Sequence, residues 1–441
     1  MTQHNSNPDE TFKNYESHEF NEYHFAKFAF RKQENDMKFY VIGISDAPRP
    51  YLPPEVIKII CQGRVFSGGK RHYGLVAPYL PEGAEWIEIT ADLDAVFGQY
   101  HDEVIVFASG DPLFYGFANT IKRRMPDAEI LLYPTFNSLQ MLAHHLVLPY
   151  HDMHIVSLTG RPWPAFDQAL IERAGKIGVL TDRVHTPAAI AQRMLDYGYC
   201  DYTMHIGEHL GNPEKEQIST MPLADVVDRE FEYPNCLILV GDDQRPRQFG
   251  IPENEFSLLD GREKMITKAP IRLLSLQALE LQEKRVLWDI GFCTGSVSIE
   301  ARLQFPHVHV EAFEVRPECE ALIQENSRRF GAPGIEVHIG DFLNADIDTL
   351  PRPDAVFIGG HGGHLKEIMA RVLTVLSDDG CIVMNSVTSP MVHTDSHKMF
   401  NEACDELCLK QEPATRIILN DNNPIEILKC KKSNKLSVLR Y

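Results

Sequence analysis

The sequence LWDIGFCTGSVSIE at residues 287–300 decides the fold of the second half of this chain. It predicts a buried strand over Arg285–Ile290, a glycine-containing loop, and a helix over Ser296–Leu303. A junction of this kind places backbone N–H groups and the N-terminus of a helix beside a ligand. Glycine is needed where the backbone turns tightly or approaches a ligand closely. The stretch therefore predicts a loop that binds a nucleotide-type cofactor.

Strands and helices alternate on both sides of this loop. A helix is predicted over Leu273–Gln282 before it and another over Pro317–Phe330 after it. Further strands are predicted at Val308–Val315, Ile335–Ile339, Ala355–Ile358, Cys381–Asn385 and Ile425–Lys429. This order is typical of an α/β fold with a largely parallel sheet, here a Rossmann-like one.

The glycine count decides between two kinds of cofactor. The dinucleotide pattern GxGxxG needs glycine at 291, 293 and 296, but the chain has Gly291, Cys293 and Ser296. Glu314 ends the next predicted strand, where an acidic residue can bind ribose hydroxyls. Asp-x-Gly-x-x-Thr-Gly with a later acidic residue, and then Gly340-Asp341-Phe342, is typical of class I methyltransferases. We therefore expect S-adenosylmethionine, although Asp289 and Glu314 could instead only cap a turn.

The C-terminal half resembles the decarboxylating C15-methyltransferases of cobalamin biosynthesis. The resemblance rests on Met265–Leu279, on the loop after Asp289, on Asp341, and on Asp354–Leu365. It implies that these residues bind the cofactor: Thr267, Asp289, Gly291, Phe292, Cys293, Thr294, Gly295, Glu314, Asp341 and Phe342. That family usually carries Gly-x-Gly-Thr-Gly, so Phe292 and Cys293 depart from it, and we expect slightly altered backbone geometry with binding retained.

A glycine-rich segment, Gly359-Gly-His-Gly-Gly-His, follows a predicted strand. So many glycines suggest a backbone that lies against a ligand. His361 and His364 are the candidate catalytic residues, since a histidine can move a proton near neutral pH. Surface histidines in a flexible loop are an equally good reading of the same residues.

The first half also alternates apolar runs with helical segments such as Pro187–Tyr197. The runs are Phe39–Ile44, Val104–Ala108, Ile130–Tyr133, His154–Leu158, Ile177–Leu180 and Cys236–Val240. They predict a second α/β unit with a largely parallel sheet.

An ordered set of motifs in this half resembles the class III tetrapyrrole methylases, and most of all their C5-methylating precorrin members. The motifs include Val41-Ile-Gly-Ile, Ser109-Gly-Asp-Pro, Pro134–Gln140 and Gly207–Lys215. The resemblance implies a cofactor cleft between two lobes, with cofactor contacts at Gly43, Gly110, Asp111, Pro112 and Ser138. A turn-forming role for Asp111 is the alternative. The opening loop, Gly43-Ile-Ser-Asp-Ala-Pro, lacks two glycines that the family usually has.

The substrate implied by these resemblances is a polycarboxylate macrocycle, a precorrin or cobalt-precorrin. Its negative charges favour lysine or arginine near the glycine loops. The candidates are Lys70, Arg71, Arg161, Lys268 and Arg272, although each could equally be a solvated surface cation.

Composition limits the remaining possibilities. The chain has 441 residues with 44% apolar and 24% charged content, and its net charge is −19. It shows no strong basic patch for nucleic acid and no apolar run that could span a bilayer. Nine scattered cysteines without a CxxC pair indicate reduced thiols in the cytoplasm. Cys404 and Cys408 could share a helix face, but we expect no metal site.

We therefore predict a mobile tail at 1–36, a tetrapyrrole-methylase domain at 37–241, a linker at 242–263 and a class I methyltransferase domain at 264–441. By resemblance, the first domain methylates C5, and the second methylates C15 and decarboxylates the C12 acetate chain. A homo-oligomer is expected, because class III relatives are commonly dimers. Two alternatives stay open: an RNA methyltransferase, and a regulatory S-adenosylmethionine-binding protein with one decayed domain.

Overall fold

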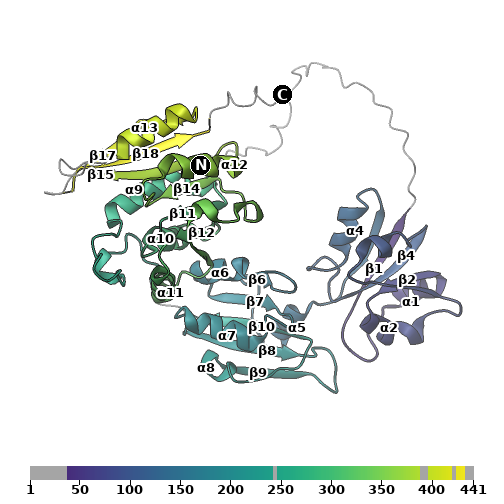
Figure 1. The fold of residues 1–441 in the computed structure, drawn as a ribbon. Coiled ribbons are helices and arrows are strands. Elements are labelled where there is room, and N and C mark those ends of the chain that lie inside the picture. The colour runs from purple at the N-terminus through teal and green to yellow at the C-terminus, as the bar shows by residue number, and fades with distance from the viewer. Residues whose placement is uncertain (1–36, 242–245, 388–395, 420–423, 433–441) are drawn as a thin grey trace, which may run out of the picture.

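The computed structural model describes residues 37–241, 246–387, 396–419 and 424–432 (Figure 1). The predicted tail at 1–36 and residues 242–245 of the predicted linker lie outside the described residues. Three sheets follow one another along the chain. We refer to residues 37–133 as the first lobe, 134–241 as the second lobe and 246–432 as the C-terminal unit.

The first lobe contains a five-stranded parallel sheet in the order β3-β2-β4-β1-β5. The strands are β1 (Lys38–Ile44), β2 (Val65–Gly68), β3 (Glu85–Glu88), β4 (Glu103–Ser109) and β5 (Glu129–Tyr133), and the helices are α1 (Pro54–Gln62), α2 (Lys70–Val76), α3 (Leu93–Phe97) and α4 (Ala118–Arg124). Ile44 pairs with Ser109, so the loops after β1 and β4 leave the same edge of the sheet.

The second lobe contains five strands in the order β6-β7-β10-β8-β9. The strands are β6 (His154–Ser157), β7 (Lys176–Leu180), β8 (Tyr202–Glu208), β9 (Gln217–Pro222) and β10 (Asn235–Gly241), and the helices are α5 (Ser138–His145), α6 (Pro164–Ile171), α7 (Pro187–Asp196) and α8 (Leu223–Val226). Only β6 and β7 pair in parallel; β10 pairs antiparallel with β7 and β8, and β8 with β9. The prediction of a largely parallel sheet is therefore wrong for this lobe. The connection from β8 to β9 is too short for a crossover helix.

The C-terminal unit has one sheet in the order β13-β12-β11-β14-β15-β18-β16, with β17 also paired to β18. The strands are β11 (Val286–Ile290), β12 (His309–Glu314), β13 (Ile335–Ile339), β14 (Ala355–Ile358), β15 (Cys381–Val387), β16 (Lys410–Gln411), β17 (Thr415–Ile417) and β18 (Ile425–Lys431). The helices are α9 (Ala269–Leu279), α10 (Ser296–Gln304), α11 (Glu318–Phe330), α12 (Leu365–Val375) and α13 (Ser396–Glu406). Single 3-10 turns lie at Ala77–Tyr79, Glu253–Glu255, Leu281–Glu283, Phe342–Asn344 and Ile347–Thr349.

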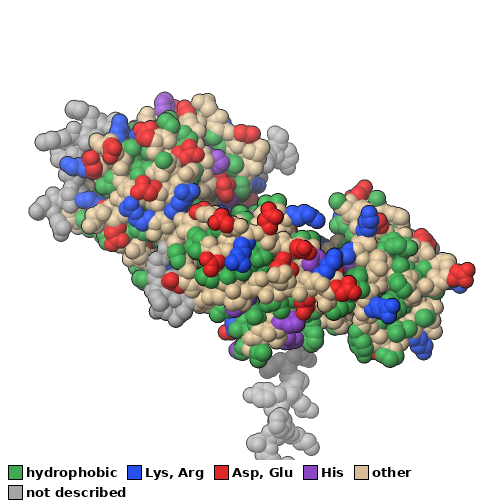
Figure 2. Space-filling view, turned by 90° about the horizontal axis from the view of Figure 1, so that it is seen from below, with side chains coloured by type: hydrophobic (Ala, Val, Ile, Leu, Met, Phe, Trp, Pro, Cys, Tyr) green, Lys and Arg blue, Asp and Glu red, His purple; other side chains and the backbone are tan. Residues whose placement is uncertain are grey.

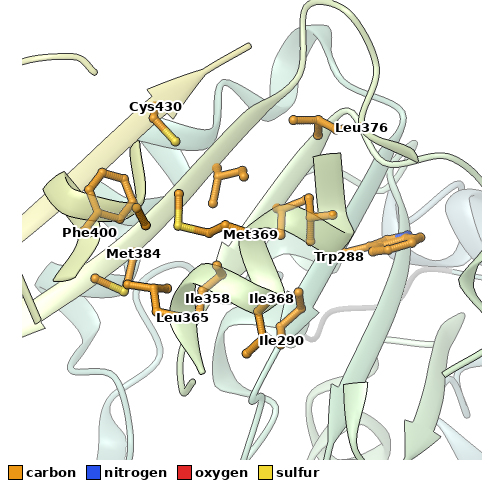
Figure 3. Close-up of a cluster of buried hydrophobic side chains, with 14 of the residues drawn as sticks. Trp288, Ile290, Ile358, Leu365, Ile368, Met369, Leu376, Met384, Phe400 and Cys430 are labelled. Carbon is orange, nitrogen blue, oxygen red and sulfur yellow. The ribbon is translucent and has the colours of Figure 1, made fainter. Parts of the chain in front are cut away.

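The predicted α/β order of this unit is confirmed, with β11 to β15 parallel and β18 antiparallel. Helix α9 begins four residues before the predicted start at Leu273, because Pro270 fits the first turn of a helix. Helix α13 ends at Glu406, so Cys408 does not share a helix face with the buried Cys404. Figure 3 shows the core that forms when Trp288 and Ile290 of β11 and Ile358 of β14 meet Leu365, Ile368 and Met369 of α12.

The second lobe is packed against the C-terminal unit (Figure 1). Ile171, at the end of α6, lies in one apolar cluster with Ile251, Phe256, Ile299, Leu303, Phe330 and Ala332. The hydroxyl of Tyr199 donates to the carbonyl oxygen of Gly331 at 2.7 Å. Residues 246–263, predicted as linker, therefore contribute buried side chains to this contact.

Candidate active sites

The loop after β11 is held by glycine at two places. Gly291 has φ of +79°, and a Cβ there would lie 2.6 Å from the backbone nitrogen of Gly360. Gly295 has φ of +74°, and a Cβ there would lie 2.3 Å from Cγ1 of Ile323. Both positions combine a left-handed backbone with a close neighbour, so only glycine fits. The loop is thus pressed against the second glycine-rich segment, 359–363.

Asp289 ties the loop to the helix that follows it. One carboxylate oxygen, Oδ2, accepts from the hydroxyl of Ser298 at 2.6 Å and from its backbone nitrogen at 3.2 Å. The other oxygen, Oδ1, is buried without a hydrogen-bond partner. Burial raises the pKa of Asp289 to about 7, against the opposing effect of the Ser298 hydrogen bonds. An unpartnered buried oxygen beneath the loop fits a site that a polar ligand completes.

Glu314 lies across the loop at the end of β12 and is 3% exposed. Its Oε2 accepts from the backbone nitrogen of Cys293 at 3.1 Å, and its Oε1 accepts from Arg316 Nη1 and from the backbone nitrogen of Val315, both at 2.9 Å. The carboxylate is therefore fixed in place, and Oε2 has one lone-pair direction left for a ligand hydroxyl.

A cavity of about 270 Å³ opens beside these groups. Its walls include predicted cofactor residues from three strand ends: Gly291, Cys293, Glu314, Asp341 and Phe342. Asp341 turns the chain by accepting from the backbone nitrogen of Leu343 at 3.0 Å. Carboxylate acceptors suit the hydroxyls of a ribose, and backbone N–H groups of glycine suit the carboxylate of an amino-acid group. S-adenosylmethionine carries both groups.

Both predicted histidines line this cavity. Burial lowers the pKa of His361 from its ordinary value, with a smaller effect from nearby His364. The backbone nitrogen of Gly363 donates to Nδ1 of His361 at 3.2 Å, so the neutral ring carries its proton on Nε2. His361 therefore presents an N–H donor at neutral pH, whereas His364 is exposed.

Other predicted residues of this half lie outside the cavity. Phe292 and Thr294 are buried, and the Thr294 carbonyl accepts from Asn326 Nδ2. Thr267 contributes its carbonyl oxygen to Arg272 rather than to the cavity. Lys268 is exposed at the start of α9 and does not line the cavity.

The prediction that Arg272 binds substrate is wrong. The side chain is fully buried, pairs with Glu300 at 3.1 Å, and also donates to the carbonyl of Ile251. Glu300 in turn accepts from the backbone nitrogens of Gly250 and Ile251. Arg272 thus holds residues 250–251 against helices α9 and α10.

A larger cavity, of about 600 Å³, lies between the first and second lobes. Four predicted residues line it: Gly110, Ser138, Arg71 and Arg161. Gly43 does not, because it is packed directly on the cavity wall, where a Cβ would lie 1.9 Å from the carbonyl oxygen of Gly110. Asp111 takes the turn-forming role, since its Oδ1 accepts from Leu113 N at 2.8 Å, and neither it nor Pro112 lines the cavity.

The hydroxyl of Ser109, which lines this cavity, is hydrogen-bonded to two neighbouring side chains. Its Oγ accepts from Arg71 Nη2 at 2.6 Å and lies 2.9 Å from Nε2 of His72. Burial, with the Arg71 charge, lowers the pKa of His72 to about 4, so its ring is neutral. Because Nδ1 of His72 accepts from the backbone nitrogen of Gly69, the proton is on Nε2 and points at Ser109. Both partners therefore donate to Ser109, and its hydroxyl proton is free for a ligand.

The remaining predicted cations differ in their surroundings. Arg161 donates to Ser157 Oγ at 2.9 Å and lies 5.1 Å over the ring of Tyr115, so it is held at the cavity wall. Lys70 is exposed and does not line the cavity.

A second cavity of about 600 Å³ adjoins the first and shares Asp46, Arg71, Tyr233 and Pro234 with it. It adds Arg183, His209 and Lys215. The sequence prediction missed this group, although His209 and Lys215 lie in the motif Gly207–Lys215. Their loops meet only in the folded lobe.

Comparison with known proteins gives one family match in each half of the chain. Residues 38–227 match the family model of tetrapyrrole (corrin/porphyrin) methylases, and residues 260–407 match that of the precorrin methyltransferase domain. The chain is 31% identical over 353 residues to a precorrin-6Y C(5,15)-methyltransferase [decarboxylating] of Sinorhizobium, covering 80% of this chain and 85% of the relative.

Two shorter relatives each match one half. A cobalt-precorrin-6B C(15)-methyltransferase (decarboxylating) of Salmonella typhi is 34% identical over 181 residues, 40% of this chain and 93% of the relative. A cobalt-precorrin-7 C(5)-methyltransferase of Salmonella typhimurium is 29% identical over 203 residues, 45% of this chain and 97% of the relative.

The fold and the two clefts thus define a methyltransferase with two units. The chain belongs to the family of the precorrin-6Y C5,15-methyltransferases (decarboxylating).

Proposed function

We propose that the chain methylates a precorrin at C5 in the cleft between its two lobes and at C15 in the C-terminal cavity, with loss of the C12 acetate carboxylate. The observation that carries this proposal is the presence of both clefts on one chain, in the order of the two single-site relatives. S-adenosylmethionine is the cofactor and supplies the methyl group at each site. The functional division follows 37–241 and 264–441.

The protein's contribution is mainly to position the reacting groups, because a reduced tetrapyrrole has nucleophilic carbons of its own. In the C-terminal cavity, Glu314 and the Gly291 backbone bind the cofactor, while the Nε2 proton of His361 is available to the substrate. In the first cleft, Gly110 shapes the floor and Ser109 donates its hydroxyl proton.

The cellular location of the enzyme and the exclusion of nucleic acid as its substrate are also proposals. All nine cysteines are free thiols, which supports a reducing cytoplasm. Among the described residues, no helix combines the length and apolar character that crossing a bilayer requires. On the face shown in Figure 2, cationic and acidic side chains are interspersed, which favours a small-molecule substrate over nucleic acid. A homo-oligomer stays a prediction.

The test is to incubate the full chain with S-adenosylmethionine and a precorrin-6-type substrate, with and without cobalt, and to follow the product by mass spectrometry. We expect two methyl groups gained and one carbon dioxide lost. Gly110→Ala, whose Cβ would lie 2.9 Å from Asn137 Cα, should abolish only the C5 methylation. Gly291→Ala should abolish only the C15 methylation and decarboxylation.

Gly261→Ala is the matched control, because Gly261 has φ of +70° but nothing within 4 Å of an added Cβ. It should retain both reactions. Absence of turnover with any tetrapyrrole would contradict the proposal.

A further inference from the structure

We infer that the second cavity, around Arg183 and Lys215, binds peripheral carboxylates of the tetrapyrrole while its ring is in the first cleft. The inference rests on the proposed function and deepens it, since it assigns a carboxylate-binding role to residues outside the predicted set.

The two cavities share part of their lining. Asp46, Arg71, Tyr233 and Pro234 line both, so a group that extends from the first cleft past these residues would reach the second cavity. The second cavity is as large as the first and is also lined by Pro48 and Asn212. A macrocycle with long carboxylate side chains can place them in such a neighbouring space.

The second cavity is lined by more cationic than acidic side chains. Its acidic residue, Asp46, is already paired with Arg71 and lies 3.5 Å from His209 Nδ1. In the part of the chain that the structure describes, Arg183 and Lys215 have no ion pair, and both are exposed to solvent. Arg183 lies 5.2 Å over the Tyr233 ring, which holds the guanidinium at the cavity wall. Two unpaired cations beside a cleft are free to bind an anionic ligand.

The boundary between the cavities also favours an anion. Ser109 has a hydroxyl proton free to donate, and the Arg71 guanidinium lies directly beside it. A carboxylate at this boundary would accept from Ser109 and lie near Arg71. Further carboxylates of the same macrocycle would reach Arg183 and Lys215. Guanidinium and ammonium groups are the usual partners of carboxylates.

The test compares two charge-matched double variants of the full chain. Arg183→Gln with Lys215→Gln removes two charges from the second cavity. Lys122→Gln with Arg123→Gln removes two exposed charges from α4, which lines neither cavity. The measured quantities are the KM for tetrapyrrole and for S-adenosylmethionine in C5 methylation.

We expect the cavity variant to raise the tetrapyrrole KM about tenfold, as for loss of roughly 1.4 kcal/mol of binding, with the cofactor KM unchanged. In the α4 variant, the KM for tetrapyrrole and the KM for S-adenosylmethionine should each stay within about twofold of the parent protein's values. Exposed charges that are not part of a site usually have effects of this size. An equal tetrapyrrole KM in the two variants would overturn the inference.

A binding measurement separates this result from failure of the proposed function. The probe is a stable polycarboxylate porphyrin, titrated by absorbance, with its methyl ester as the uncharged comparison. The cavity variant should bind the acid about tenfold more weakly than the α4 variant, and the ester should not distinguish them. If the acid binds both variants equally, no carboxylate subsite exists, even where methylation is observed. If inorganic phosphate displaces the acid as well as a tricarboxylate does, the cavity is a general anion site and the inference fails.

Discussion

The backbone nitrogen of Cys293 donates to Oε2 of Glu314 at 3.1 Å, and Cys293 makes this contact with φ of +50°. That left-handed conformation costs a non-glycine residue roughly 1–2 kcal/mol. The family that the C-terminal half resembles usually has glycine here. The loop therefore has the left-handed backbone conformation that glycine would adopt at position 293. The hydrogen bond to Glu314 forms although Cys293 has a side chain.

We expect Cys293→Gly to retain cofactor binding, because it relieves the backbone while preserving the N–H that faces Glu314. Cys293→Val should weaken cofactor binding at the C-terminal site by at least about tenfold, since β-branched residues are strongly disfavoured at positive φ. Calorimetric titration with S-adenosylhomocysteine measures the cofactor-site affinity of both variants. C5 methylation in the same samples serves as the folding control. Unimpaired binding by the valine variant would contradict the assigned loop geometry.

Asp289 should make the stability of the protein depend on pH. Its pKa is about 7 in the folded protein and ordinarily 3.8, so the folded state holds the proton more tightly. This contribution to stability is complete below about pH 4 and is lost as pH rises through 7. Asp289→Asn keeps the acceptor for Ser298 but cannot titrate.

Urea unfolding without cofactor at pH 5 and pH 8 measures this effect. The parent protein should lose about 2 kcal/mol more stability between these pH values than Asp289→Asn does. Equal losses would show that Asp289 is already ionised at pH 5.

Ser109→Ala should raise the tetrapyrrole KM for C5 methylation about tenfold, because a hydrogen bond to a charged group contributes about 1.5–3 kcal/mol. C15 methylation should not change. Ser67→Ala is the matched control, since Ser67 on the adjacent β2 bonds only inward, to Ile87 O and Tyr100, at 2.8 Å each. A change in KM of the same size in both variants would indicate a general loss of packing.

Tyr199→Phe should couple the two halves of the chain less tightly. It removes the hydroxyl that donates to Gly331 O, at a cost of about 1 kcal/mol. Tyr202→Phe removes a similar bond, to Ala174 O at 2.9 Å, but within the second lobe. Calorimetry should show separate unfolding transitions for the lobes and the C-terminal unit only in Tyr199→Phe. Identical single transitions in both variants would argue against this role.

The sequence predicted most of the strands that are continuous apolar runs, and it predicted where they alternate with helices in the C-terminal unit. It missed β3 and β9, because only Ile87 of β3 and Met221 of β9 are buried. It also missed the short β16 and β17, and β8, in which polar residues separate the buried Tyr202, Met204 and Ile206. Edge strands of this kind carry little apolar pattern. The antiparallel pairing of β10 was missed because an apolar run has no direction.

The cofactor loop could be predicted because Asp289 and Gly291 lie at the end of one apolar strand, β11, and Glu314 lies at the end of the next, β12. Arg272 could not be judged, since its burial depends on Glu300, which lies 28 residues later. Arg183 and Lys215 were not predicted as site residues, because only the fold brings their loops to Arg71. Local pattern thus predicts residues at strand ends, whereas charge pairing requires the tertiary structure.

The contact around Ile171 and Tyr199 ties two parts of the chain together. It joins the second lobe to the C-terminal unit through buried apolar side chains and the hydrogen bond from Tyr199 to Gly331. The wall of the first cleft that carries Arg161 belongs to the lobe that makes this contact. On the proposed function, a substrate that stays on this wall after C5 methylation would therefore remain on the lobe that is packed against the second site.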